Sequence, residues 1–200
     1  NLEADLVIPV PDSGVPAAIG YSEEIKSNVE LGIIRNHYVG RTFIEPTQNI
    51  RSLGVKLKHN VNKSLVKNKS LILIDDSLVR GTTSVKIVKM LYEAGAKEVH
   101  LRIAAPPIKY PDYYGVDTPN QDELLAAKLD LEGMRKFINV TTLQFLSIDG
   151  LYKAMGYQKR NSTYPQFTDH CFTGEYPVKP VDASDKDFMS NKMSFMSSKI

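Results

Sequence analysis

The sequence is poor in cysteine, lacks tryptophan, and has no long apolar run and no large excess of charge. Its single cysteine, Cys171, excludes a disulfide within the chain, so a reducing, cytoplasmic compartment is expected. No apolar stretch approaches the roughly 18 residues of a membrane-spanning helix, so no membrane role is expected. The formal net charge is only +2, which argues against nucleic acid as a partner.

The composition is that of a globular protein, with 42% hydrophobic and 24% charged residues in a chain of 200. This length suggests a single domain, which we assign to residues 1–181. From Asp182 the chain turns to Ser, Lys, Asp and Met, and we expect residues 182–200 to be poorly ordered or ordered only by a partner. An apolar run begins almost at once, at Leu6, which suggests a piece of a longer protein.

Hydrophobic patterning predicts an α/β fold with a mostly parallel sheet flanked by helices, because strands and helices alternate. We expect strands at 4–10, 31–35, 70–76, 98–105 and 143–148. We expect helices at 15–27, 82–93, 121–127, 131–138 and 150–155. On the first helix, Ile19 and Ile25 are expected on the buried face with Ala17 and Ala18. Residues 36–60 are polar, partly basic and weakly periodic, which is typical of a functional loop.

The segment from Leu71 to Ser84, LILIDDSLVRGTTS, carries the strongest functional signal. An apolar strand ends in two carboxylates, Asp75 and Asp76, and a helix begins near Thr82. Ligands of open α/β sheets bind beyond the carboxyl ends of the strands. A helix N-terminus offers free N–H groups to a phosphate, and a glycine lets the backbone approach it. We therefore predict a phosphate site formed by Arg80, Gly81, Thr82, Thr83 and Ser84.

The two aspartates would repel that phosphate and instead suit hydroxyl groups or a cation. A ribose with two neighbouring hydroxyls, next to its own 5-phosphate, fits both halves of the motif, and hard oxygen ligands also suit Mg²⁺. The sequence contains neither the Gly-x-x-x-x-Gly-Lys-Ser/Thr nor the Gly-x-Gly-x-x-Gly pattern, so the usual nucleotide loops are not indicated.

This segment resembles the signature of the type I phosphoribosyltransferases, which bind phosphoribosyl pyrophosphate (PRPP). Further motifs resemble the glutamine PRPP amidotransferase family, in that family's order and spacing. They are Val10–Gly14, Tyr38–Ile44, Asp75–Ser84, Ala104–Pro107, Tyr114–Asp117 and Cys171–Gly174. The resemblance covers roughly residues 4–181 and implies a type I phosphoribosyltransferase fold with a mobile active-site loop.

The resemblance also implies a role for each matching residue. Mg²⁺ would be held by Ser13, Asp75 and Asp76, and the pyrophosphate side by Asp12, Ser13 and Gly14. The 5-phosphate would be held by Arg80, Gly81, Thr82, Thr83 and Ser84, with Ser77 also near the substrate. The mobile loop would include Arg35, Tyr38, Gly40, Arg41, Thr42 and Phe43. The candidate catalytic residues are Arg41, Asp75 and Asp76.

The resemblance implies synthesis of 5-phosphoribosylamine from PRPP and ammonia, the first committed step of purine synthesis. An N-terminal glutaminase domain, absent here, would supply the ammonia. A homo-oligomer and feedback by purine nucleotides are also implied. Some family members carry an iron–sulfur cluster held by cysteines near these C-terminal segments. Here Asp112 stands at a candidate position, and one cysteine cannot hold a cluster that needs four ligands, so no iron–sulfur cluster is expected.

Two alternatives remain. The chain could be a PRPP- or nucleotide-binding regulator that uses the same fold without catalysis, although it keeps the loop motif and has no basic DNA-binding stripe. Alternatively, the fragment could bind PRPP without turnover. The histidines and the cysteine carry weaker signals, because their spacing does not predict a metal site. We expect surface or loop histidines at His37, His59, His100 and His170, and an incidental thiol at Cys171.

Overall fold

The computed structural model describes residues 3–36 and 59–178. Its centre is a parallel sheet of four strands in the order β1-β4-β5-β6. The strands are β1 (Leu6–Pro9), β4 (Ser70–Asp75), β5 (Glu98–Ile103) and β6 (Thr142–Phe145). The predicted parallel sheet is therefore confirmed. All six residues of β4 are buried, as expected for a central strand that is covered on both faces.

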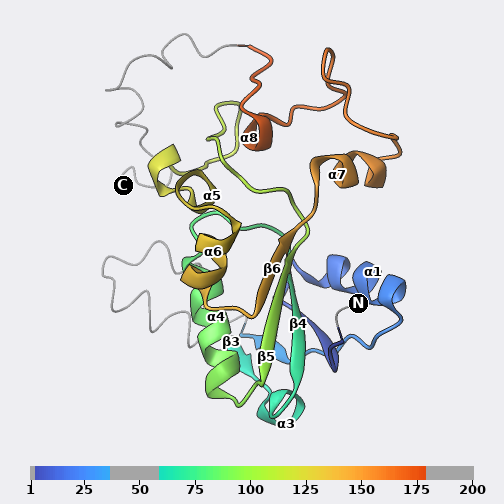
Figure 1. The fold of residues 1–200 in the computed structure, drawn as a ribbon, viewed down its shortest axis with the longest axis vertical. Helices are drawn as coiled ribbons and strands as arrows, with labels where there is room; N and C mark the ends of the chain where they lie inside the picture. Colours follow the sequence, from blue (N-terminus) through green and yellow to red (C-terminus); the bar gives the residue numbers. More distant parts are fainter. Residues whose placement is uncertain (1–2, 37–58, 179–200) are drawn as a thin grey trace.

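Helices cover both faces of this sheet (Figure 1). One face carries α1 (Val15–Ile25), where Ala18 packs on Val7, Ile72 and Ile74. The other face carries α4 (Thr82–Glu93) and α6 (Leu131–Ile138), and it encloses the larger hydrophobic core. Burying apolar side chains on both faces is the main stabilising contribution to such a layered domain.

Helix α4 has the predicted bounds, and its Ile87, Val88 and Leu91 are buried. The predicted apolar face of α1 is wrong in part. Ile19 and Ile25 are 47% and 42% exposed, whereas Ala18 and Ser22 are buried. The helix approaches the sheet through these two small residues, which lie one helical turn apart on the same side.

Several remaining elements differ from the prediction in their bounds. A short antiparallel pair joins β2 (Ile33–Arg35) to β3 (His59–Val61), so His59 and Asn60 belong to a strand and not to the predicted loop. The expected helix at 121–127 is divided into a 3₁₀ turn, η2 (Gln121–Glu123), and α5 (Leu125–Lys128). The final predicted helix is α7 (Ile148–Ala154). Two further short helices, not predicted, are α3 (Lys63–Val66) and α8 (His170–Thr173).

Figure 1 shows α5, α7 and α8 beyond the end of the sheet toward which the parallel strands run. This is the end at which open α/β sheets bind ligands. Among the described residues, no helix combines the length and the apolar composition that crossing a bilayer requires.

Candidate active site

Two loops meet at the carboxyl ends of β1 and β4, which are neighbours in the sheet. The first loop, Val10–Gly14, leads from β1 into α1. The second, Ser77–Gly81, leads into α4 and is called the phosphate loop below. Ser13 Oγ donates a hydrogen bond of 3.1 Å to Asp76 Oδ1 across 63 residues of sequence. The parallel pairing of β1 with β4 thus joins two motifs that the sequence analysis singled out separately.

Asp75 and Asp76 are adjacent but lie in different surroundings. Asp75 is 7% exposed, and burial together with the neighbouring Asp76 raises its pKa to about 8. Asp76 is exposed and accepts hydrogen bonds from Ser13 and Ser77. These oxygen donors are the type that Mg²⁺ prefers. A cation here would offset the repulsion that raises the pKa of Asp75, so the donor set fits the expected ion.

The N-terminus of α4 forms an open cradle for an anion. Gly81 precedes the helix with φ of +75°, and no side chain caps the first turn. The first N–H groups of a helix lack partners within it, and they favour a negative charge. Thr82 and Thr83 are exposed beside them, whereas Ser84 is buried. Of the predicted hydroxyl donors, the two threonines are therefore the accessible ones.

Arg80 lies beside this cradle, but the structure gives it a protein partner that the sequence did not predict. Its Nε donates to Glu123 Oε2 at 2.8 Å, and both side chains are about half exposed. Leu125 N also donates to Val79 O at 2.8 Å. The segment of η2 and α5 therefore supports the phosphate loop from outside. The residue types gave no signal for these contacts, because Arg80 and Glu123 are 43 residues apart.

The first loop is held by a similar ion pair and by a close backbone approach. Arg35 Nη1 donates to Asp12 Oδ2 at 2.6 Å. A Cβ atom on Gly14 would lie 2.5 Å from the carbonyl oxygen of Ile74 and 2.9 Å from that of Val10. Only glycine fits this position. The loop therefore passes directly over the end of β4.

The remaining members of the predicted mobile loop lie outside the described residues. They are Tyr38, Gly40, Arg41, Thr42 and Phe43, and the predicted surface or loop histidine His37 also lies outside the described residues. The predicted catalytic role of Arg41 and the position of this loop over the site therefore stay predictions. The predicted tail, 182–200, also lies outside the described residues.

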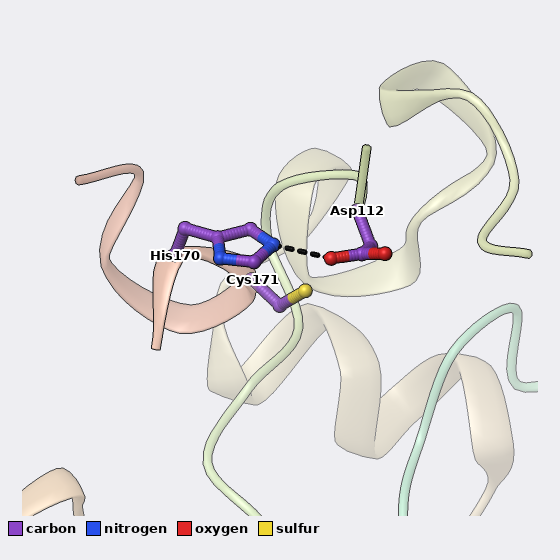
Figure 2. Close-up of side chains that lie close together, drawn as sticks. All are labelled: Asp112, His170 and Cys171. Carbon is purple, nitrogen blue, oxygen red and sulfur yellow. Dashed lines mark hydrogen bonds and ion pairs between the residues drawn. The ribbon is translucent and has the colours of Figure 1, made fainter. Parts of the chain in front are cut away.

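A second group of side chains lies near α8 (Figure 2). The ligand-type atoms of Asp112, His170 and Cys171 all lie within 4.8 Å of one another. The Asp112 carboxylate contacts His170 Nε2 at 2.5 Å and accepts from the N–H groups of Tyr114 and Val116 at 3.0 and 2.7 Å. A carboxylate with these partners is satisfied without an ion. The group joins α8 to the loop after β5.

The prediction of surface or loop positions for the histidines requires correction. His59, His100 and His170 are 6%, 4% and 4% exposed, so they are not surface histidines. His100 lies in β5 between Ser70 and Thr142, which contact its two ring nitrogens at 3.3 and 3.0 Å. Buried histidines with such partners are structural. Sequence spacing could not reveal His100 and His170, because they pair with residues distant in the chain.

The parallel sheet, the carboxylates at the end of β4 and the anion cradle at α4 are the arrangement expected of an α/β protein of the phosphoribosyltransferase class. Comparisons with known proteins identify the family. The chain is 57% identical over 198 residues to an amidophosphoribosyltransferase of Rhizobium etli, covering 98% of the chain. It is 48% identical over 178 residues to that of Bacillus subtilis, covering 89% of the chain. In sequence the chain therefore belongs with the amidophosphoribosyltransferases.

The fold gives the same result. The solved structure of the Bacillus subtilis glutamine PRPP amidotransferase, complexed with ADP and GMP, matches with a TM-score of 0.77 at 48% identity. This match covers 88% of the chain and 38% of the solved protein. The chain likewise spans 40% and 37% of the two relatives described above. No family model matches the chain.

Proposed function

We propose that this chain is the transferase part of an enzyme that makes 5-phosphoribosylamine from PRPP and glutamine-derived ammonia. This reaction would be the first committed step of purine synthesis. The observation that carries the proposal is the hydrogen bond from Ser13 to Asp76. It brings a pyrophosphate-side loop and a ribose-phosphate motif to adjacent strand ends. The high identity to amidophosphoribosyltransferases over nearly the whole chain supports the same function.

The proposed roles follow from the chemistry of each group. The N–H groups and threonine hydroxyls at the start of α4 would bind the 5-phosphate. The loop Asp12–Gly14 would face the pyrophosphate, with Arg35 offsetting the charge of Asp12. Ser13, Asp75 and Asp76 would hold Mg²⁺, which supplies positive charge to the leaving pyrophosphate. These roles place the two phosphate groups at the two loops and the ribose between them.

The reaction would replace the C1–oxygen bond of PRPP with a C1–nitrogen bond to ammonia, with loss of one proton from nitrogen. Pyrophosphate would leave with the bonding electron pair. Positive charge would develop on the ribose, and the exposed carboxylate of Asp76 would stabilise it. Preorganised groups of this kind contribute most where charge develops. Closure of the segment Tyr38–Ile44 over the ligand would exclude water.

We extend several further features to this protein as proposals. Residues 1–181 would form one transferase domain, working with a glutaminase domain in the full-length product and within a homo-oligomer. Purine nucleotides would bind as feedback ligands, since the Bacillus subtilis relative is complexed with ADP and GMP. A cytoplasmic location would fit a chain with one cysteine.

The test is ammonia-dependent release of pyrophosphate from Mg-PRPP by the full-length gene product. We expect turnover that requires both ammonia and Mg²⁺. Tight PRPP binding without any pyrophosphate release would contradict the enzymatic proposal and would favour the regulatory alternative. If the protein neither bound PRPP nor released pyrophosphate, both the enzymatic proposal and the regulatory alternative would be contradicted.

A further inference from the structure

The segment Gln121–Lys128 contacts the phosphate loop at three successive residues. Leu125 N donates to Val79 O, and Glu123 pairs with Arg80. A Cβ atom on Gly81 would lie 2.7 Å from Cδ2 of Leu125. Three contacts of different kinds thus hold the main chain and the arginine of one short loop. The segment works as a support for that loop.

The Arg80 pairing uses only one edge of the guanidinium group. Its Nε is 2.8 Å from Glu123 Oε2. Within the described ranges 3–36 and 59–178, no hydrogen bond is made by Nη1 or Nη2. Arginine is planar, so fixing Nε also restricts where the two terminal nitrogens point. The long side chain is 51% exposed, and without a partner it would populate many rotamers.

We propose that Glu123 is a positioning residue for phosphate binding, acting through Arg80. It holds the guanidinium so that the Nη groups meet the 5-phosphate at the start of α4. This inference rests on the proposed function for the identity of the ligand. The carboxylate also cancels the charge of Arg80, so a purely electrostatic role would oppose phosphate binding. The two roles therefore predict opposite effects when Glu123 is removed.

The experiment compares two substitutions in the full-length protein. Glu123→Ala removes the acceptor, and we expect the KM for PRPP to rise about tenfold with kcat within about twofold, as for lost binding at a group distant from the bond that breaks. Glu123→Gln keeps an oxygen acceptor at the same reach, so we expect its KM to stay near wild type. Asp122→Ala is the matched control, because Asp122 is the neighbouring exposed acid on η2.

Inhibition by the two halves of the substrate separates positioning from general damage. In Glu123→Ala we expect ribose 5-phosphate to inhibit about tenfold more weakly, whereas inorganic pyrophosphate, bound at the first loop, keeps its inhibition constant. Equal weakening of both inhibitors would overturn the proposal. Tighter PRPP binding in both variants, or a Glu123→Ala variant like the Asp122→Ala control, would overturn it too.

Failure of the proposed function is recognised separately. Calorimetric titration with ribose 5-phosphate measures phosphate binding without turnover. If the wild-type protein binds ribose 5-phosphate, releases no pyrophosphate from PRPP, and loses that binding in Glu123→Ala, the enzymatic proposal fails and the positioning role of Glu123 stands. If the wild-type protein is active and Glu123→Ala leaves ribose 5-phosphate binding unchanged, the positioning role fails and the enzymatic proposal stands.

Discussion

Two identical side chains at consecutive positions, Asp75 and Asp76, lie in different surroundings in this site. Asp75 is the last residue of β4, and its side chain is buried. Asp76 is one residue further along and is exposed. Successive side chains of a strand point to opposite sides, and β4 ends at Asp75, so the two carboxylates differ in burial. Burial accordingly raises the pKa of Asp75 to about 8, while Asp76 is available to a ligand.

We predict that Asp75→Asn and Asp76→Asn each lower PRPP turnover in the full-length enzyme by at least ~100-fold, through lost positioning and electrostatic stabilisation. Steady-state rates of ammonia-dependent pyrophosphate release are the measurement. The fold should survive, because a neutral amide can replace a carboxyl whose raised pKa already favours the neutral form. Asp122→Asn serves as the control, with an unchanged rate. Near-wild-type kinetics in both aspartate variants would refute the assignment.

A pair of glycines in the same region offers a stability test. Gly14 lies where a Cβ atom would meet backbone oxygens of Ile74 and Val10, which cannot move aside. We expect Gly14→Ala to lower the free energy of unfolding by about 1–3 kcal/mol, the usual cost of overpacking. Gly20 lies inside α1, and a Cβ atom there would meet nothing within 4 Å, so Gly20→Ala should stabilise by about 0.5–1 kcal/mol. Urea unfolding measures both, and equal effects would contradict the packing argument.

At the scale of elements, the region after α7 depends on one buried ion pair. Arg160 contacts Asp169 at 2.5 Å, and the two side chains are only 12% and 3% exposed. Tyr152 of α7 donates to the same carboxylate at 2.8 Å. These contacts fasten α8 and the chain before it to α7. Burial would raise the pKa of Asp169, but the hydrogen bonds from Arg160 and Tyr152 outweigh it and lower that pKa.

Removing the Arg160 side chain should therefore destabilise the folded protein. We predict that Arg160→Gln lowers the free energy of unfolding by about 3–5 kcal/mol, since it leaves a buried carboxylate without its cation. Lys89→Gln is the control, because Lys89 and Glu93 form an exposed pair at 3.8 Å and such pairs contribute about 0–1 kcal/mol. Chemical denaturation with hydrogen exchange over residues 160–176 locates the effect. A loss no larger than that of the control would show that the pair is dispensable.

The same carboxylate predicts a pH dependence. The folded-state pKa values of Asp169 and Asp112 both lie below the ordinary range. The contribution of these two carboxylates to the free energy of unfolding is therefore fully present above their unfolded-state pKa of about 4. It is lost as the pH falls through their folded-state pKa values. We expect calorimetric stability to drop as the pH falls below about 4. The drop should be smaller in Asp169→Asn, and an unchanged slope in that variant would contradict the assignment.

At the scale of the whole molecule, the sequence predicted what local patterns determine. The run Leu71–Asp75 is apolar up to its final aspartate, so the sequence predicts a buried strand there. It also predicts the helix that begins at Thr82 with the bounds that the structure shows. The buried face of α1 was partly wrong, because which side of a helix packs depends on how closely it approaches the sheet. Asp112 and His170 are separated by 58 residues, and no local pattern connects them.

The candidate site also combines features that the sequence predicts with features that depend on the fold. Its residues could be named from the motifs, but their contacts depend on the strand order. The pairing of β1 with β4 brings Ser13 within hydrogen-bond distance of Asp76. The hydrophobic periodicity of a sequence does not reveal the order of strands in a sheet. Arg80 was predicted as a phosphate ligand from its type and position. Its partner Glu123 arrives only because η2 and α5 fold back on the phosphate loop.

If the two loops form one site, a ligand that bridges them should stabilise the whole domain more than its separate halves. PRPP at 100 times its dissociation constant would add about 2.7 kcal/mol to the free energy of unfolding. Its two ends share one molecule, so the second loop binds at a high effective concentration once the first is occupied. A mixture of ribose 5-phosphate and inorganic pyrophosphate at the same concentrations lacks this linkage. We therefore predict, with Mg²⁺ present, a larger rise in melting temperature for PRPP than for the mixture.

Chelating the cation should remove most of the PRPP effect, because the exposed carboxylate of Asp76 then faces the phosphates without compensation. Asp76→Ala should lose the difference between PRPP and the mixture, since it removes the acceptor through which Ser13 joins the two loops. Differential scanning calorimetry with each ligand set is the measurement. If the mixture stabilised the wild-type protein as much as PRPP does, the loops would bind independently, and the adjacency of β1 and β4 would not unite them into one substrate site.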